Sequence, residues 1–187
     1  MAAGAGVLVL GGCIGSIERD DFDDEVRGRG GGLDGGLLTD AVDAIEADLG
    51  VDELRVQSFE VRPGYVIVQV QVPADPEALD VYRFGSSGLY GGRGLTGPTP
   101  VPRRADAPPL DGLVFAPEDA GLDAFDDMVD EALEVAELDG GYATDAAVRQ
   151  APSGDIGPVT GVTVTDDRST VVVTFSADGT VVERAQR

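Results

Sequence analysis

The feature that most constrains this chain is a run of alternating valines. Valine occupies every second position from 66 to 72, and the residues between them are Ile67, Gln69 and Gln71. A period of two predicts a β-strand with one buried face and one wetter face. Pro63-Gly64 before the run and the segment Pro73–Pro76 after it are typical of turns, because proline fixes φ and glycine permits positive φ.

Other elements around this strand predict a first structural unit. An apolar stripe with helical spacing predicts a helix over Leu38–Leu49, with Thr39 as its N-cap and Gly50 as its end. Strands are expected at Leu54–Arg62 and Leu79–Phe84, on either side of the valine strand along the chain. A short return at Leu89-Tyr90 is possible after them.

A similar order of elements follows in the C-terminal part of the chain. The amphipathic segment Leu122–Leu138 predicts a second helix, and a short helix is expected at Thr144–Gln150. Three strands then follow, at Thr160–Thr165, Thr170–Ser176 and Thr180–Arg184. Ala177-Asp178-Gly179 joins the last two, as a hairpin turn.

The intervening segment Gly91–Pro117 is rich in proline and glycine. Proline removes sheet hydrogen-bond donors and restricts its neighbour, so we expect a linker or loop rather than sheet. Arg93, Arg103 and Arg104 form a local basic spot. Either a flexible linker or a patch that docks an acidic or aromatic partner agrees with this composition.

These elements predict an α+β fold. It consists of two αβββ repeats, with antiparallel sheet or sheets and the helices packed on one face. The expected division is a first repeat over residues 37–90, a linker over 91–120 and a second repeat over 121–187. Together they provide about 150 residues, enough for one ordinary domain or two small packed halves.

Charge excludes one class of partner. The formal net charge is -22, from 35 acidic residues against 13 basic ones. A field of this sign repels phosphate backbones, so nucleic-acid binding is not expected, whereas cations or a basic protein surface would be attracted. All the basic residues are arginine, which agrees with a G+C-rich genome; a salty habitat would also favour the excess of acids.

The N-terminal residues indicate a cellular location. Ala2–Gly12 is a short apolar run that fits the core of a signal peptide and is too short to span a bilayer. Leu10-Gly11-Gly12-Cys13 resembles a bacterial lipobox. That resemblance implies cleavage after residue 12, lipidation of Cys13 and anchoring at the extracytoplasmic face of the cell membrane. The alternative is an apolar N-terminal strand with a buried free cysteine.

Residues 13–36 are expected to form a disordered tether. The segment Ile14–Gly36 is acidic at first and then rich in glycine, so it cannot bury enough surface to offset its ordering entropy. Asp20, Asp21, Asp23 and Asp24 could hold Ca²⁺, but they lack the glycine and terminal glutamate of an EF-hand loop. A solvated charge run is the preferred interpretation.

The element order also resembles a known repeat. PepSY-like repeats of bacterial envelope proteins are resembled by two sets of pieces: Tyr82-Arg83-Phe84 with Gly88-Leu89, and Thr174-Phe175 with Asp178-Gly179-Thr180-Val181. The resemblance covers residues 38–90 and 122–184. The whole chain also resembles uncharacterised lipoproteins of high-G+C Gram-positive, actinobacterial type. PepSY-type domains are associated with protease inhibition and accessory roles in the envelope, but no residue set carries over.

Composition argues against most catalysis. The chain has no histidine or lysine and a single cysteine, which excludes Ser-His-Asp and Cys-His catalysis, His- or Cys-ligated zinc and the P-loop lysine. We therefore expect no catalytic residue, cofactor or metal site. The favoured function is an interaction module that binds another envelope protein, and the expected surface is an exposed apolar or aromatic patch near Tyr65, Tyr82 and Tyr90. The alternatives are a carrier of lipid or another apolar ligand and, less favoured, an acid-dependent hydrolase.

Overall fold

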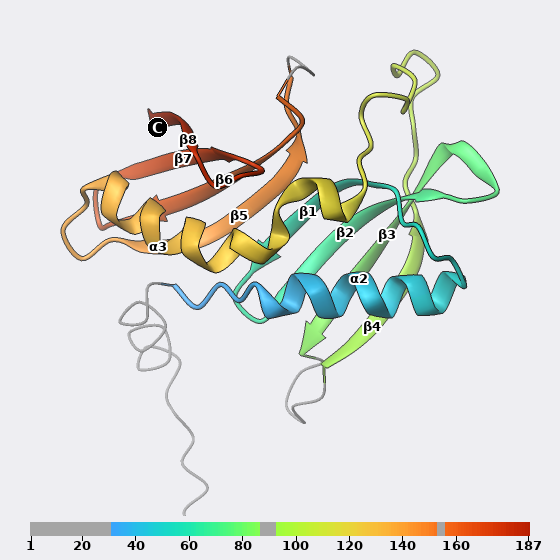
Figure 1. Cartoon of the computed structure of the whole chain (residues 1–187), viewed down its shortest axis with the longest axis horizontal. Coiled ribbons are helices and arrows are strands. Elements are labelled where there is room, and N and C mark those ends of the chain that lie inside the picture. The colour runs from blue at the N-terminus through green and yellow to red at the C-terminus, as the bar shows by residue number, and fades with distance from the viewer. Residues whose placement is uncertain (1–30, 87–92, 153–155) are drawn as a thin grey trace, which may run out of the picture.

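The chain builds one antiparallel sheet with two α-helices against one of its faces (Figure 1). This computed structural model describes residues 31–86, 93–152 and 156–187. In the described residues the sheet has eight strands in the order β4-β3-β2-β1-β5-β6-β7-β8. The predicted α+β class, with helices on one face of an antiparallel sheet, is confirmed.

Each half of the chain is a helix followed by a strand meander. In the first half the elements are α2 (Gly36–Leu49), β1 (Val56–Arg62), β2 (Tyr65–Val72), β3 (Asp75–Ser86) and β4 (Arg93–Pro100). In the second half they are α3 (Phe125–Ala136), β5 (Tyr142–Gln150), β6 (Pro158–Thr165), β7 (Thr170–Ser176) and β8 (Val181–Gln186). The short 3-10 helices η2 (Pro117–Ala120) and η3 (Leu122–Ala124) lie between the halves.

The two halves share one continuous sheet. Strands β1 and β5 pair antiparallel, with Phe59 opposite Val148 and Val61 opposite Ala146. This pairing, here called the seam, places β4 and β8 at the two outer edges. The predicted αβββ order is present in both halves, and each half carries one strand more than predicted.

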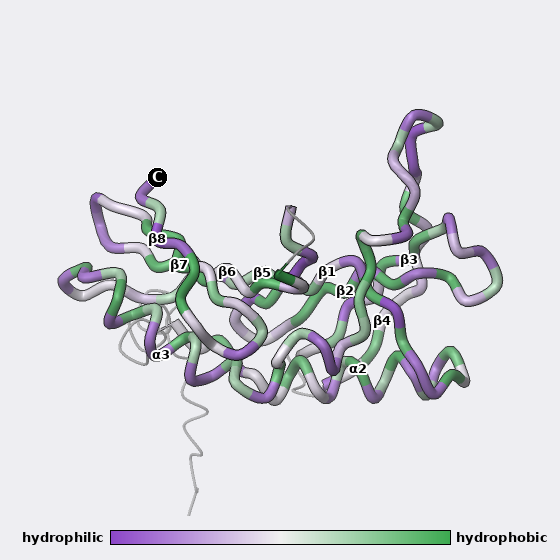
Figure 2. The backbone as a smooth tube through the Cα atoms, turned by 45° about the horizontal axis from the view of Figure 1, so that its top comes forward, coloured by the Kyte–Doolittle hydropathy of each residue, from purple (hydrophilic) through white to green (hydrophobic). Residues whose placement is uncertain are grey.

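The valine run of β2 forms the predicted half-buried strand. Val66, Val68 and Val70 are buried against the helices, whereas the residues between them are partly exposed. Val72 is only partly buried, because the pairing register between β2 and β3 shifts after Gln71. The helix α2 is also amphipathic: Figure 2 shows hydrophilic and hydrophobic stretches that alternate along it, and its residues Leu38 and Ile45 are fully buried.

The start of α2 differs from the prediction. Thr39 lies inside the helix, and the N-cap position is Gly35, without a side-chain cap of its own. Instead the Gly35 N–H donates to Asp126 Oδ1 at 2.8 Å, so that α3 supplies the missing acceptor. The predicted end is correct, because Gly50 adopts the left-handed conformation with φ 65°.

The segment before α2 is also more ordered than predicted. The tether was expected to extend to residue 36, but Gly31 and Gly35 are buried and Leu33 packs against the core. That part of the prediction is wrong, because contacts with the second half fix these residues. The earlier part of the tether, Cys13 and the aspartates at 20–24 lie outside the described residues.

The expected loop Gly91–Pro117 contains a strand. Residues Arg93–Pro100 form β4, which pairs with β3 and places Leu95 opposite Phe84. The prediction failed because proline is tolerated on an edge strand, where only one side of the backbone joins the ladder. The remainder of the segment folds back over the sheet, and Leu110 is fully buried there.

The predicted short helix Thr144–Gln150 is a strand instead. It lies within β5, between β1 and β6, and buries Ala143, Ala146 and Val148. Alanines favour a helix locally, but strand partners on both sides outweigh that weak preference. The second helix is as predicted in its core, with Phe125, Met128 and Ala132 buried.

Candidate functional site: the open face of the sheet

Both helices cover the same side of the sheet, which leaves the opposite side uncovered by helix (Figure 1). We call this opposite side the open face. Its members alternate with the buried residues along each strand. They include Ser58, Glu60, Arg62, Tyr65, Ile67, Gln69, Gln71, Leu79, Val81, Arg83, Asp145, Ala147, Arg149, Val159, Gly161, Thr163, Val172, Thr174 and Glu183.

The first half of the open face is covered by large side chains. The Arg83 guanidinium carbon lies 4.2 Å from the centroid of the Tyr65 ring, a cation-π contact between β3 and β2. Toward the other end of these strands, Leu79 is buried with Leu110 and Val114 from the loop that follows β4. Side chains therefore fill both ends of this half.

The seam carries a polar cluster centred on Asp145. Arg62 lies 3.3 Å from Asp145 Oδ2 as an ion pair. The Thr144 hydroxyl donates to Oδ2 at 2.9 Å, and the Thr163 hydroxyl donates to Oδ1 at 3.2 Å. The Asp145 carboxylate is thus compensated by neighbours from three strands.

The second half of the open face is hollow. A recess of about 120 Å³ lies over β5, β6 and β7, with Ala147 and Gly161 among its lining residues. Arg149 and Arg187 also line it, together with the hydroxyl-bearing residues Thr163 and Thr174. This recess is the most distinctive chemical feature of the open face, and the sequence did not predict a binding role for any of these residues.

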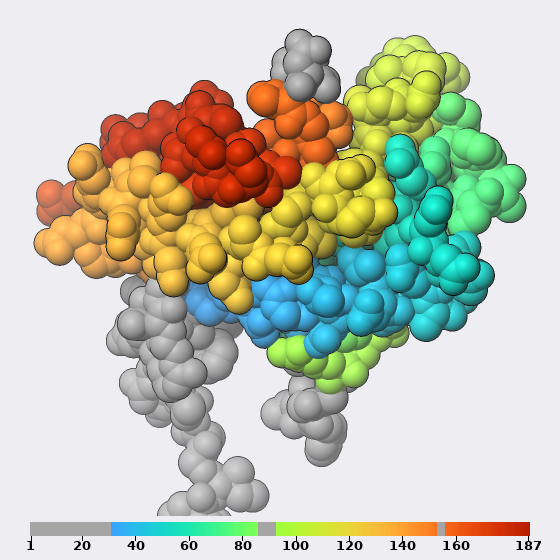
Figure 3. Space-filling view, viewed as in Figure 1, coloured from blue at the N-terminus to red at the C-terminus, as the bar shows by residue number. Residues whose placement is uncertain are grey.

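The helix side, which faces the viewer in Figure 3, is acidic. Helix α2 carries four acidic residues and α3 carries five, and neither helix contains a basic residue. Two recesses on this side, of about 270 and 290 Å³, are lined in part by carboxylates of Asp126, Asp130, Glu118 and Asp123. Such linings suit a lipid chain poorly, because apolar ligand pockets carry few charges.

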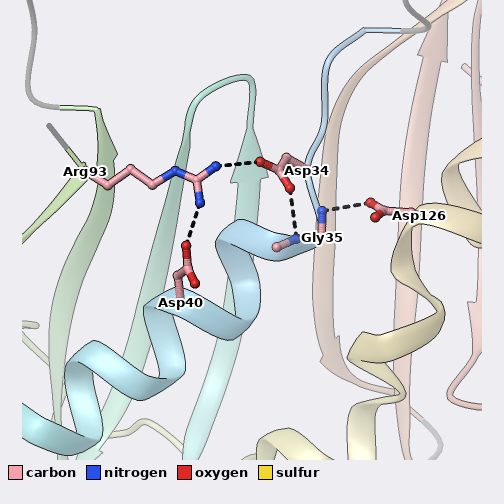
Figure 4. Close-up of polar contacts among 6 residues, drawn as sticks. Asp34, Gly35, Asp40, Arg93 and Asp126 are labelled. Carbon is pink, nitrogen blue, oxygen red and sulfur yellow. Dashed lines mark hydrogen bonds and ion pairs between the residues drawn. The ribbon is translucent and has the colours of Figure 1, made fainter. Parts of the chain in front are cut away.

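The basic spot predicted in the linker is not a free patch. Arg93 binds two carboxylates at the start of α2, Asp34 at 2.9 Å and Asp40 at 2.5 Å (Figure 4). Arg103 pairs with Glu77 at 2.8 Å, and Arg104 pairs with the nearby Asp106. The three arginines are therefore neutralised within the chain, as part of its fold.

The predicted aromatic patch is only partly correct. Tyr65 lies on the open face, but Tyr82 is 1 % exposed and faces α2, where its hydroxyl donates to Asp48 Oδ2 at 3.4 Å. Burial, and then the charges of Asp48 and Asp80, raise the pKa of Tyr82 above 10.0. Tyr90 lies outside the described residues.

One carboxylate of the described residues has a shifted pKa, and the shift is downward. The Asp178 pKa is lowered, because the Ser176 hydroxyl and the Thr180 N–H donate to its carboxylate in the β7–β8 turn. A general acid would need the opposite shift. Within residues 31–86, 93–152 and 156–187, no cluster of three metal-ligating side chains occurs, and no helix is long and apolar enough to cross a membrane.

Comparisons with known proteins support the fold. The structure is similar to the crystal structure of a putative lipoprotein from Clostridium difficile 630, with a TM-score of 0.57 and 9% sequence identity. The alignment covers 80% of this chain and 92% of that protein. No protein-family profile matches the chain, and no curated protein sequence matches it. The resemblance to PepSY-like repeats thus stays a prediction.

Proposed function

We propose that this protein is a lipid-anchored, extracytoplasmic protein of the cell envelope that binds another envelope protein through the open face of its sheet. In this proposal the protein is not an enzyme and needs no cofactor. Cys13 carries the lipid, and residues 14–30 connect it to residue 31.

One observation carries the proposed binding role. Two helices cover one side of an eight-stranded sheet, and the other side presents half-exposed apolar and aromatic side chains beside arginines. Ile67, Val81 and Val172 are only partly buried there. A surface that mixes apolar area with Tyr and Arg has the composition typical of protein interfaces.

Two further observations support the envelope location. Leu10-Gly11-Gly12-Cys13 has the residue types of a lipobox, and the fold is similar to that of a putative lipoprotein from another bacterium. A diacylated cysteine would anchor the chain stably, whereas one acyl chain gives only marginal binding. The carrier of an apolar ligand is a weaker candidate, since carboxylates border the two recesses on the helix side.

The anchor is tested with Cys13→Ala. We expect the wild type to enter the detergent phase in a detergent partition of cells, and the variant to enter the aqueous phase. A wild-type protein that stays in the aqueous phase with Cys13 unmodified would contradict the anchor.

The binding face is tested by site-specific photo-crosslinking in intact cells. One protein carries the crosslinker in place of Ile67 on the open face, and a matched control carries it in place of Glu131, which is exposed on α3. We expect a discrete adduct from position 67 and none from position 131. Equal labelling from the two positions, or none from position 67, would refute binding through the open face.

A further inference from the structure

The recess in the second half of the open face is built from small side chains in paired positions. Ala147 lies opposite Gly161, and Gly161 lies opposite Thr174, so one row across β5, β6 and β7 has no large side chain. A Cβ atom at Gly161 would be in ordinary contact, 3.7 Å from Val172 Cγ1 and 4.0 Å from the Ala147 oxygen. The missing side chain at Gly161 therefore helps to create the hollow.

Among the residues that line this recess, the charge without an ion-pair partner is positive, although Glu60 and Glu183 stand beside it, opposite Ala147 and Thr174. Arg149 and Arg187 both line it and are exposed, and neither guanidinium forms an ion pair with a carboxylate of the described residues. Asp145 is the acidic residue of the lining, and Arg62, Thr144 and Thr163 already compensate it. Other described arginines, among them Arg83 and Arg168, also form no ion pair, but Arg149 and Arg187 line the same recess.

The two arginines approach the recess from different strands. Arg149 stands near the end of β5, opposite Val159 of β6. Arg187 follows β8, and its backbone N–H donates to the Thr170 oxygen at 2.9 Å. A group held in the recess can thus meet a guanidinium on more than one side, and each guanidinium presents a planar fork of donors that matches a carboxylate.

We infer that this recess binds the carboxylate of an aspartate or glutamate side chain on the partner protein. This inference rests on the proposed function and names the chemistry of its partner. The volume of about 120 Å³ equals that of roughly four water molecules, at about 30 Å³ each, which accommodates the carboxylate end of a side chain. Thr174 adds a hydroxyl donor beside the two guanidinium groups.

A protein carboxylate fits this site better than the phosphates of a membrane surface. A dense array of lipid phosphates would repel a molecule of net charge -22 as a whole, whereas a single acidic side chain on a partner does not. The nine acidic residues of α2 and α3 belong to the opposite side of the sheet. A helix layer about 10 Å thick, together with the sheet, separates these residues from the recess, and this distance weakens the repulsion that they exert there.

The test is an NMR titration of the full chain with the peptide acetyl-Gly-Glu-Gly-amide at constant ionic strength. We expect saturable shifts of the backbone amide signals of Gly161, Thr163 and Thr174. The matched peptide with glutamine in place of glutamate should leave these signals in place. Arg149→Ala and Arg187→Ala should each weaken binding by about tenfold, whereas Arg168→Ala, which removes an exposed arginine outside the recess, should leave it unchanged.

Filling the recess gives an independent arm of the test. Gly161→Val should abolish the shifts, and Gly161→Ala should weaken them. Gly161 needs no positive φ, so at least the alanine variant is expected to fold. Shifts that survive both substitutions, or equal shifts from the glutamine peptide, would overturn the inference. The same holds if vesicles of phosphatidylglycerol perturb these signals and the glutamate peptide does not.

Failure of this inference is distinguishable from failure of the proposed function. If the open face binds a partner through other residues, the adduct from position 67 in cells persists in a Gly161→Val background while the peptide titration shows no shifts. If the open face binds no partner, the adduct is absent in both backgrounds. An adduct that is lost in Gly161→Val, together with peptide shifts that depend on Arg149, supports both.

Discussion

On the first half of the open face, the Tyr65 ring and the Arg83 guanidinium cover β2 and β3, whereas on the second half Ala147 and Gly161 leave a recess beside two arginines. The scaffold is the same on both sides of the seam, a helix followed by four meandering strands. Because strand side chains alternate between faces, residues of the open face can differ without altering the core beneath the helices. The comparison teaches that two halves with the same order of elements can present very different surfaces on the open face.

The largest expected effect concerns whether the two halves form one cooperative unit. Phe59 is fully buried at the seam, and its ring centroid lies 6.3 Å from that of Phe115. We expect Phe59→Ala to lower the free energy of unfolding by about 3–5 kcal/mol, because it removes a large side chain and leaves a cavity. Urea unfolding followed by circular dichroism measures this change.

Ile67→Ala is the control for that variant. It changes a half-exposed residue of the open face on the neighbouring strand and should cost about 1 kcal/mol. Since β1 and β5 pair across the seam, hydrogen exchange should show both halves losing protection together in the Phe59 variant. Loss of protection in the first half alone would show that the two halves unfold independently and would contradict one cooperative unit.

The sequence predicted the parts of this fold that depend on local pattern. The period of two in the valine run assigned β2 and its buried face, and the apolar stripe assigned the core of α3, because both signals lie within a few residues. It missed β4 and β5, whose local chemistry is proline-rich and alanine-rich. Only their partners in the sheet, distant along the chain, make these segments strands.

The candidate site was predictable only in part, for the same reason. Tyr65 could be placed opposite the buried valines once β2 was assigned, but Tyr82 was assigned to the wrong face of β3. The position of Arg83 on the open face follows once its neighbours Tyr82 and Phe84 are known to be buried. The approach of Arg149 and Arg187 depends on the pairing of four strands, which no local pattern contains.

The next effect compares the glycines at helix ends in the two halves. Gly121 precedes η3 and α3 with φ 62°, and a Cβ atom there would lie 1.8 Å from the Ala177 oxygen. Gly50 ends α2 with φ 65°, and such an atom would meet nothing within 4 Å. We expect Gly121→Ala to cost about 3 kcal/mol and Gly50→Ala about 1 kcal/mol, because only the first adds a backbone clash to the strain. Thermal unfolding of the two variants measures the difference, and equal costs would contradict it.

A smaller effect is expected at the seam ion pair. Arg62 and Asp145 are 42% and 29% exposed, so Asp145→Asn should lower stability by about 0.5–1 kcal/mol at low salt and by less at high salt. The control is Asp106→Asn, which breaks the pair of Arg104 and Asp106 at 85% and 73% exposure. That variant should be neutral within the error of urea unfolding. A cost at Asp145 that does not change with salt would assign its role to the threonine hydrogen bonds instead.

The smallest effect at neutral pH concerns a position that differs between the halves. Tyr82 is buried in β3, two residues before Phe84, whereas Val173 is buried in β7, two residues before Phe175. The hydrogen bond from the Tyr82 hydroxyl to Asp48 is long, at 3.4 Å. We therefore expect Tyr82→Phe to lower the free energy of unfolding by about 0.5 kcal/mol at pH 7.

At alkaline pH, the stability of Tyr82→Phe should depend on pH less than that of the wild type. The Tyr82 pKa is raised in the folded state, first by burial and then by Asp48 and Asp80, so the unfolded chain releases this proton first as the pH rises past 10.0. The stabilisation linked to the protonated hydroxyl is fully present below that pH and is lost as the pH rises toward the folded pKa. Urea midpoints above pH 10.0 should therefore fall more steeply for the wild type than for Tyr82→Phe. The control Tyr65→Phe keeps Tyr82 and should retain the steeper fall, because its ring lies on the open face away from α2. If Tyr82→Phe instead followed the wild type throughout, the hydroxyl would not be desolvated in the folded protein, and the packing of α2 against the first half would be looser than the burial of Tyr82 implies.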